Sequence, residues 1–225
     1  MEITGGSDPR PGEVSLAHHG VLFLDELPEF ERKVLEVLRE PLESRVINIS
    51  RASRQACFPA DFQLVAAMNP CPCGYLGHTS GRCQCTPEQI TRYAGKLSGP
   101  LLDRIDMHVQ VPALAAGDLA TVSPGEGSQQ IRLRVQQARD RQLQRQGCCN
   151  ARLSGAELEQ YAAADQSSLV LLGEVLDRLG LSARSYHRIL RIARTIADID
   201  GTPTIEPKHI AEAIQYRTLD RTYWA

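Results

Sequence analysis

The feature that most constrains the fold is the stretch GVLFLDELPEF at positions 20–30. Its four consecutive apolar residues, Val21 to Leu24, predict a strand buried on both faces, because helices cover both sides of a parallel sheet. The strand ends abruptly at two acids, Asp25 and Glu26. A buried strand with a polar edge is typical of an α/β domain built around a parallel sheet.

The two acids have two interpretations. At the carboxyl end of a central strand, one carboxylate can hold Mg²⁺ through its water shell. The other can orient the water that attacks a γ-phosphate. This is the Walker B pattern of P-loop ATPases. The alternative is a core strand in which Asp25 or Glu26 caps the next helix and faces its positive end.

The composition is that of an ordinary globular protein, with 225 residues, 42% hydrophobic and 23% charged. A net charge of −2 leaves nucleic-acid binding to local patches. No apolar run approaches the roughly 20 residues of a membrane span, and the polar N-terminus is not a signal peptide. Seven cysteines without an export signal favour the cytoplasm, and metal binding over disulfides.

An amphipathic helix is expected after the acidic pair. Its apolar face is predicted to consist of Phe30, Val34, Val37 and Leu38. Pro41 is expected to mark the boundary of this helix or a kink in it.

A β-hairpin is predicted for residues 45–58, whose apolar and polar residues alternate around a basic tip with Arg51 and Arg54. A second buried strand, Phe62 to Met68, follows and ends at Asn69. Asn69 precedes a proline and can simply form a turn. If the two buried strands are parallel, its amide instead lies at the same sheet edge as the acidic pair and can help to orient water.

Four cysteines form two close pairs, Cys71 with Cys73 and Cys83 with Cys85. Two pairs across a short loop can supply four thiolates to a tetrahedral Zn²⁺, and His78 between them is a substitute ligand. The alternative is a set of reduced structural thiols. The sequence therefore predicts a candidate zinc site.

The chain then changes character. Arg104, in LLDRID, precedes a third predicted strand, His108 to Val111, and taken alone belongs to an ordinary surface ion pair. Prolines and glycines from 112 to 127 predict a linker. Beyond it the pattern is helical with no clear strand, and helices are expected near 155–164 and 167–179.

A helix predicted for 128–146 is rich in arginine. A solvated face is the favoured interpretation, and a nucleic-acid contact is the alternative. Its arginines are Arg132, Arg134, Arg139, Arg141 and Arg145.

Another helix is predicted from the N-cap Ser182, and the last helix spans Pro207 to Tyr216. The predicted buried face of the first of these consists of Ile189, Ile192, Ala193 and Ile196. Arg184 lies in its first turn, where a cation opposes the helix dipole, so pairing with an external anion is expected.

Together these residues resemble the magnesium-chelatase-like branch of the AAA+ ATPases, of the ComM/YifB type. The resemblance covers most of the chain and is carried by PGEVSLAHHGVLFLDELPEF, SRVINISRASRQACFPADFQLVAAMNPCPCG, GPLLDRID and LSARSYHRILRIARTIAD. It implies an α/β fold in which residues 1–112 are the C-terminal part of an AAA+ core. Residues 113–127 are then a linker, and 128–225 a helical lid.

The resemblance also implies roles for single residues. Asp25 and Glu26 correspond to the Walker B pair that binds Mg²⁺ and ATP, and Asn69 to sensor 1. Arg104 corresponds to an arginine finger offered to the neighbouring subunit, and Arg184 to the sensor 2 arginine of the lid. The family's members are hexameric rings that use ATP to move DNA, with ComM-type members implicated in branch migration during natural transformation.

One departure from the family pattern is the absence of Walker A. The only Gly-Lys pair, Gly95-Lys96, is followed by leucine and has no glycine five residues before it. We therefore expect a C-terminal piece of a longer protein rather than a truncated paralogue, and little or no ATP hydrolysis by the chain alone. The alternatives to a DNA motor are the motor of a metal chelatase and a zinc-stabilised interaction module without a motor.

Overall fold

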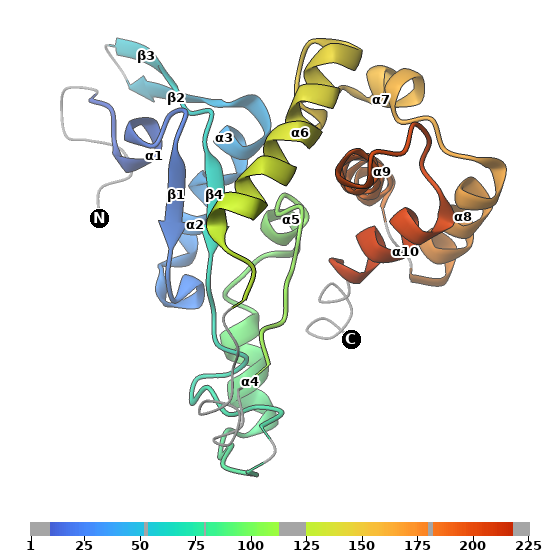
Figure 1. Cartoon of the computed structure of the whole chain (residues 1–225). Helices are drawn as coiled ribbons and strands as arrows, with labels where there is room; N and C mark the ends of the chain where they lie inside the picture. The colour runs from blue at the N-terminus through green and yellow to red at the C-terminus, as the bar shows by residue number, and fades with distance from the viewer. Residues whose placement is uncertain (1–9, 52–53, 79, 113–124, 180–181, 218–225) are drawn as a thin grey trace. The chain divides into compact units, whose positions relative to one another are not determined.

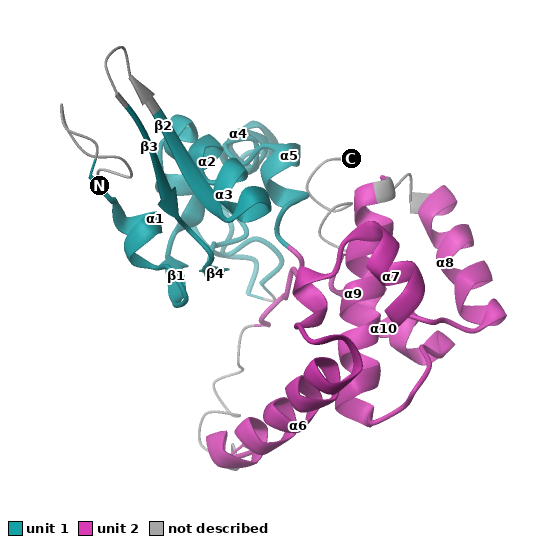
Figure 2. Ribbon diagram, turned by 90° about the horizontal axis from the view of Figure 1, so that it is seen from above, with its two compact units in different colours: residues 1–105 teal, residues 106–225 magenta. Residues whose placement is uncertain are grey.

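The computed structural model describes residues 10–51, 54–78, 80–112, 125–179 and 182–217. They form two compact units, residues 1–105 and 106–225 (Figure 2). The first is mixed α/β with a small parallel sheet, and the second is mostly helical, which agrees with the predicted fold class. Among the described helices, none is both long and apolar enough to cross a bilayer.

The first unit contains strands at the predicted places, but the second of the two expected buried strands is shorter than predicted and is not buried, with Val65 40% exposed. β1 (Val21–Leu24) pairs in parallel with β4 (Gln63–Ala66), with Leu24 opposite Ala66 (Figure 1). β2 (Val46–Arg51) and β3 (Arg54–Pro59) form the predicted antiparallel hairpin. The helical elements of this unit are α1 (Glu13–Leu16), η1 (Leu27–Glu29), α2 (Arg32–Val37), α3 (Arg39–Ser44), α4 (Pro87–Ala94) and α5 (Gly99–Leu102).

The expectation that β1 is buried on both faces is wrong. Leu22 and Leu24 lie in the core, whereas Val21 and Phe23 are each 59% exposed. The elements of this unit cover one face of the two-stranded sheet. The core of the unit consists of Val14, Leu22, Leu24, Leu27, Leu35, Leu38, Ile47, Ala60, Leu97 and Leu101.

The helix after the acids also differs from its prediction. Two short helices, α2 and α3, meet at Leu38, and Pro41 lies in the first turn of α3. A proline is tolerated there because the first N–H groups of a helix have no partner inside it. Leu35 is buried, whereas Val37, which we placed on the buried face, is 39% exposed.

The predicted strand at 108–111 is absent from the described structure. The backbone N–H of His108 donates to the Tyr216 carbonyl (2.7 Å), and Val109 and Val111 are 63% and 87% exposed. An alternating sequence forms a strand only where a neighbouring strand offers partners, and this segment instead lies against the end of the last helix.

The second unit follows the predicted helices closely. Its longest helix, α6 (Ser128–Gln146), has the predicted bounds and ends at Gly147, whose φ of 74° is the left-handed conformation that favours glycine at a helix end. The others are η3 (Asn150–Arg152), α7 (Gly155–Tyr161), α8 (Gln166–Leu179), α9 (Ala183–Asp200) and α10 (Pro207–Gln215).

The packing of α9 confirms most of its predicted buried face. Ser182 caps the helix by accepting a hydrogen bond from the Ser185 N–H. Ile189 and Ala193 are fully buried, and Ile192 is 8% exposed. These residues form the core of the unit together with Leu153, which follows η3, and with residues of α7, α8 and α10.

Candidate functional site

The two acids lie at the carboxyl edge of the parallel pair, and both are exposed. The N–H of Glu26 donates to Asp25 Oδ1 (2.9 Å), and Glu26 has the left-handed conformation (φ 51°, ψ 47°). Such backbone conformations cost a non-glycine residue on the order of 1–2 kcal/mol and are concentrated at functional sites. Although Glu26 is the N-cap residue of η1, it makes no side-chain cap, so the capping alternative fails there.

The ends of the two parallel strands remain tied together beyond their last paired residues. The Ala67 N–H donates to the Leu24 carbonyl, and the Leu27 N–H donates to the Ala67 carbonyl, each over 2.9 Å. Asn69, two residues further on, therefore follows the strand next to the one that ends at the acids. Exposed carboxylates are ligands that Mg²⁺ accepts, so the donor set at this edge fits the ion.

The four cysteines come together. Their Sγ atoms all lie within 4.8 Å of one another, and Cys71 Sγ lies 3.4 Å from Cys73 Sγ and 3.8 Å from Cys83 Sγ. A Zn–S distance of about 2.3 Å requires tetrahedral S···S distances of about 3.8 Å. A disulfide would need about 2.05 Å. The thiol geometry therefore fits a tetrahedral metal ion.

The thiols differ in acidity. A hydrogen bond from the Tyr75 backbone, together with hydrogen bonds from the Cys71 and Cys85 side chains, lowers the pKa of Cys73 to about 6. The hydrogen bond to Cys73 and burial raise the pKa of Cys85 to about 12. One thiolate is therefore available near neutral pH, and binding of a metal would displace the remaining thiol protons.

His78 is not part of this cluster in the described structure. Its Nδ1 accepts a hydrogen bond from the Ser80 N–H (3.0 Å). The four cysteines suffice for a tetrahedral ion without it.

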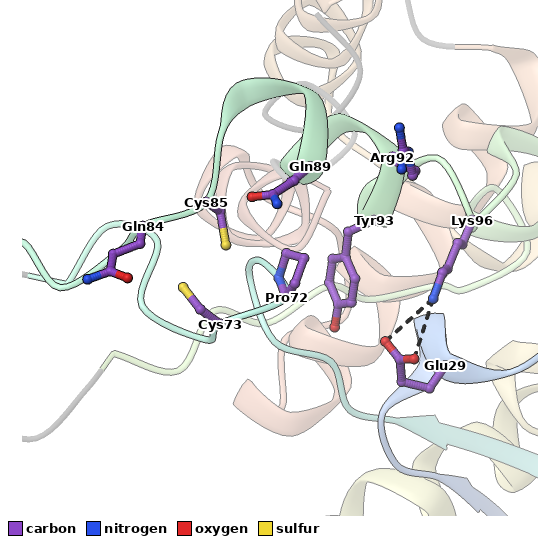
Figure 3. A pocket seen from close by; sticks show the side chains of 9 residues that line it. All are labelled: Glu29, Pro72, Cys73, Gln84, Cys85, Gln89, Arg92, Tyr93 and Lys96. Atoms are coloured by element: carbon purple, nitrogen blue, oxygen red, sulfur yellow. Dashed lines mark hydrogen bonds and ion pairs between the residues drawn. The ribbon is translucent and has the colours of Figure 1, made fainter.

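A shallow pocket of about 480 Å³ lies beside the cysteines (Figure 3). Tyr93 stands between Pro72 and Glu29, and Lys96 Nζ lies 3.4 and 3.5 Å from the Glu29 carboxylate oxygens. The other lining residues are Cys73, Gln84, Cys85, Gln89 and Arg92. Sequence reasoning did not single out Tyr93 or Lys96, and only the apolar face of α4 would have indicated Tyr93.

The side chain of Arg104 points into the first unit. Its Nε donates to the Arg39 carbonyl (3.1 Å), one terminal nitrogen donates to the Pro100 carbonyl (2.6 Å), and the other pairs with Glu43 (2.8 Å). The Arg104 side chain is 7% exposed. These contacts join α3 to α5, so this conformation does not present the guanidinium to another molecule.

The other predicted site residues are less constrained. Arg184 is exposed in the first turn of α9, and its pairing with an external anion stays a prediction. Arg51 and Arg54 lie opposite one another in the β2–β3 ladder, at the end of the hairpin. Their side chains and residues 52–53 are outside the part of the chain that the structure describes.

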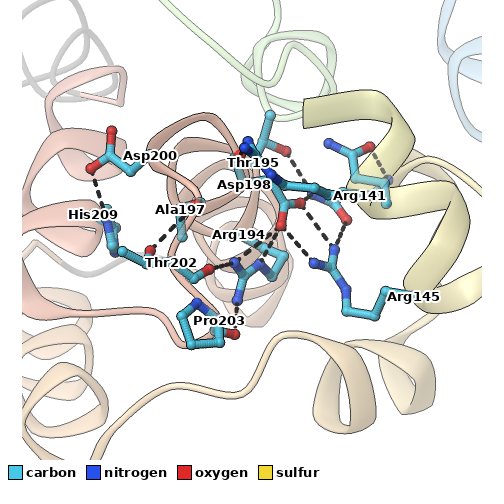
Figure 4. A network of polar contacts seen from close by, with 12 residues as sticks. Arg141, Arg145, Arg194, Thr195, Ala197, Asp198, Asp200, Thr202, Pro203 and His209 are labelled. Carbon is cyan, nitrogen blue, oxygen red and sulfur yellow. Dashed lines mark hydrogen bonds and ion pairs between the residues drawn. The ribbon is translucent and has the colours of Figure 1, made fainter. Parts of the chain in front are cut away.

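A buried polar network in the second unit was not foreseen (Figure 4). Arg145 binds Asp198 with two hydrogen bonds (2.6 and 2.9 Å), and Arg194 also pairs with Asp198 (3.1 Å). The Arg141 guanidinium donates to the Asp198 carbonyl (2.5 Å). A solvated face is therefore the wrong interpretation for the C-terminal half of α6.

Comparison with known proteins adds family relationships to this geometry. Residues 2–119 match the family described as magnesium chelatase, subunit ChlI, and residues 125–217 match the C-terminal family of the same subunit.

Individual proteins match along almost the whole chain. The protein YifB of Escherichia coli is 50% identical and the competence protein ComM of Haemophilus influenzae 51% identical, each over 97% of this chain. An uncharacterized protein of Mycobacterium tuberculosis is 43% identical over 96%. The chain spans only 43% of the length of each of these relatives.

Proposed function

Because this chain belongs to the magnesium chelatase ChlI family and resembles its ComM/YifB type, we propose that it is a segment of an ATP-driven AAA+ motor that acts on DNA. Residues 1–112 are then the C-terminal part of the motor's core, 113–127 the linker and 128–225 the lid. The missing phosphate-binding loop has to come from another segment of the complete protein. The chain alone is expected to hydrolyse little or no ATP.

The observation that carries this proposal is that Asp25 and Glu26 lie at one edge of the sheet, beside the segment that leads to Asn69. Asp25 would bind Mg²⁺ through its water shell, and Glu26 would accept a proton from the attacking water. Asn69 would orient that water. When bound, Mg²⁺ would neutralise charge on the phosphates.

The two arginines would act from different subunits of a ring, which we propose is a hexamer. Arg184 would bind the nucleotide of its own subunit. Arg104 would exchange Glu43 for the phosphate of a neighbour's nucleotide when the ring assembles, since Glu43 holds it in the isolated chain. An arginine at a transferred phosphoryl group contributes about 10³–10⁵ in rate in related enzymes.

The hairpin tip is the proposed DNA contact, through Arg51 and Arg54. The name of one relative, competence protein ComM, supports DNA over other substrates. The second candidate is the motor of a metal chelatase, which the name of the family supports. The two arginines of the predicted hairpin tip favour DNA, because cationic side chains are the groups that contact phosphates.

For the four-cysteine cluster we propose a structural Zn²⁺. Four thiolates and no open position are typical of zinc sites that stabilise folds rather than perform chemistry.

The proposal is testable in a chimera in which this chain replaces the corresponding segment of H. influenzae ComM. We expect DNA-stimulated ATP hydrolysis that Glu26→Gln abolishes while ATP still binds. Glu31→Gln is the matched control, since Glu31 is exposed and lies outside the strand edge. Full turnover by the Glu26→Gln chimera would refute the role of the acidic pair.

A second assay tests whether Arg104 acts on the nucleotide of a neighbouring subunit. Mixtures of Arg104→Ala and Glu26→Gln chimeras are expected to recover part of the activity, because some interfaces then combine both wild-type groups. No recovery at any mixing ratio would show that Arg104 does not act across an interface.

A third assay tests the DNA site. Arg51→Ala with Arg54→Ala is expected to lower the salt dependence of DNA binding by about one unit of slope per lost contact. Unchanged affinity and slope would move the DNA contact elsewhere, with the exposed Arg132 and Arg139 of α6 as the next candidates. Stimulation of hydrolysis by a chelatase partner instead of DNA would support the second candidate function.

A further inference from the structure

The four-cysteine cluster is built from the segments on either side of one loop. Cys71 comes two residues after Asn69, and Cys85 directly precedes Thr86, the N-cap of α4. Thr86 and Gln89 form a capping box at this helix start. An ion held by all four thiolates would therefore join the end of the β4 segment to the N-terminus of α4 as one rigid piece.

The side chain of Asn69 packs on the same loop. A turn closes between Cys71 and Gly74, whose N–H donates to the Cys71 carbonyl (3.0 Å). Gly74 has a φ of 79°, and a Cβ built on it would lie 3.7 Å from Asn69 Oδ1. The amide that we assign to water orientation thus lies against the turn that holds the first cysteine.

Helix α4 leads from the cysteines back to the strand edge. Tyr93 is 6% exposed; burial raises the pKa of its hydroxyl, and the nearby backbone of Asn69 partly opposes this rise. Just after the helix, Lys96 pairs with Glu29, three residues beyond Glu26 in η1. Figure 3 shows the side chain of Tyr93, on α4, beside Pro72, and that of Lys96, just after α4, pointing to Glu29. One helix therefore contacts both segments that follow the parallel strands.

We propose that the metal site positions the ATPase residues: an ion on the four cysteines fixes α4, and through Tyr93 and Lys96 it fixes Asn69 and the η1 segment. Tyr93 and Lys96 are positioning residues that touch neither nucleotide nor metal. Loss of the ion would loosen this edge and slow hydrolysis without removing ATP binding. The consequence for hydrolysis rests on the proposed function, whereas the mechanical coupling does not.

Hydrogen exchange on this 225-residue chain tests the coupling directly. The chain is compared after loading with Zn²⁺ and after removal of the ion with a chelator. We expect Zn²⁺ to slow exchange at 70–86 and also at 26–30 and 67–70, by about fivefold or more, the factor that corresponds to one hydrogen bond. Peptides from α9 serve as the internal reference. Protection confined to 70–86, or no Zn²⁺ binding, would overturn the proposal.

Two variants test the contact of Tyr93 and the contact of Lys96 separately. Tyr93→Phe keeps the ring and is expected to retain Zn²⁺ and the protection of 70–86, while the protection of 67–70 is lost. Lys96→Met is expected to lose protection only at 26–30. Tyr75→Phe is the matched control, since Tyr75 lies in the same loop and is 42% exposed. Unchanged exchange at 67–70 in Tyr93→Phe would refute the role of Tyr93.

The chimera provides the catalytic readout. Removing Zn²⁺, or introducing Tyr93→Phe, is expected to lower kcat with little change in KM for ATP, because the phosphate-binding loop of the proposed motor comes from another segment and Tyr93 does not touch the nucleotide. Zn²⁺-independent kcat in an active chimera would refute the positioning role. Coupled exchange in the isolated chain together with an inactive chimera would instead refute the proposed function and leave the coupling intact.

Discussion

The backbone N–H of Leu27 donates to the carbonyl of Ala67 over 2.9 Å, which ties the turn that carries Glu26 to the segment that leads to Asn69. This bond continues the pairing of β1 and β4 past their last strand residues. It holds Glu26 in a left-handed conformation that a glutamate adopts only at a cost.

The variant Glu26→Gly is expected to have a higher free energy of unfolding than the variant Glu26→Ala. Alanine retains the left-handed strain and glycine removes it, so Glu26→Gly should exceed Glu26→Ala in unfolding free energy by about 1 kcal/mol. At position 31, where φ is −59°, the order should reverse. Urea denaturation followed by circular dichroism measures both pairs. The same order at both positions would contradict the left-handed assignment.

Purified chain is expected to bind about one Zn²⁺, because a structural site of this kind uses four ligands around one ion. Cys71→Ser should release the metal, whereas Cys57→Ser in the hairpin should retain it, since Cys57 lies outside the cluster. Metal should also be lost as the pH falls and protons compete for the thiolates. Metal analysis after dialysis at several pH values measures this. Equal metal content in both variants would rule out the site.

Among the described residues of the second unit, loss of the charge of Asp198 is expected to lower the free energy of unfolding the most. It is 1% exposed between Arg145 and Arg194 (Figure 4). Asp198→Asn would leave two cations without their counter-charge and should cost about 3–5 kcal/mol in unfolding free energy. Asp140→Asn, an exposed site on α6, should change it by less than about 0.5 kcal/mol. A cost as small as that of Asp140→Asn would contradict the importance of the network.

The contribution of Asp198 should depend on pH. Burial raises its pKa, but hydrogen bonds from Arg145 and Asn150 outweigh burial and leave the pKa below the ordinary value. A carboxylate whose pKa is lowered by folding stabilises the fold above its unfolded pKa of about 3.9, and this stabilisation is lost as the pH falls further. Wild type and Asp198→Asn should therefore differ in denaturation midpoint at pH 6 and converge toward pH 2.

Arg104 is expected to stabilise the fold of the isolated chain, independently of any role in catalysis. Lysine cannot reproduce its contacts to Arg39, Pro100 and Glu43, so Arg104→Lys should cost about 1–3 kcal/mol in the isolated chain. Arg92→Lys, at an exposed position of α4, is the control and should be nearly neutral. An Arg104→Lys chain as stable as the control would show that these contacts do not persist in solution.

Sequence reasoning succeeded where the information is local. The bounds of α6, the hairpin and the cap of α9 follow from alternation, glycine and capping residues, each acting within a few positions. The four cysteines were identified for the same reason, because close spacing in the chain brings each pair together in space. The proximity of Asn69 to the acidic pair followed from one further assumption, that the two strands before them are parallel.

Local patterns by themselves determined the kinds and order of elements and the residues able to carry chemistry. Only the tertiary structure decided which face of β1 is exposed, that 108–111 forms no strand, and that Arg104 and Arg145 turn inward to distant carboxylates. It also decided that Tyr93 reaches Asn69. These outcomes depend on partners tens of residues away, and no periodicity within a segment specifies which distant group will neutralise a charge or cover an apolar face.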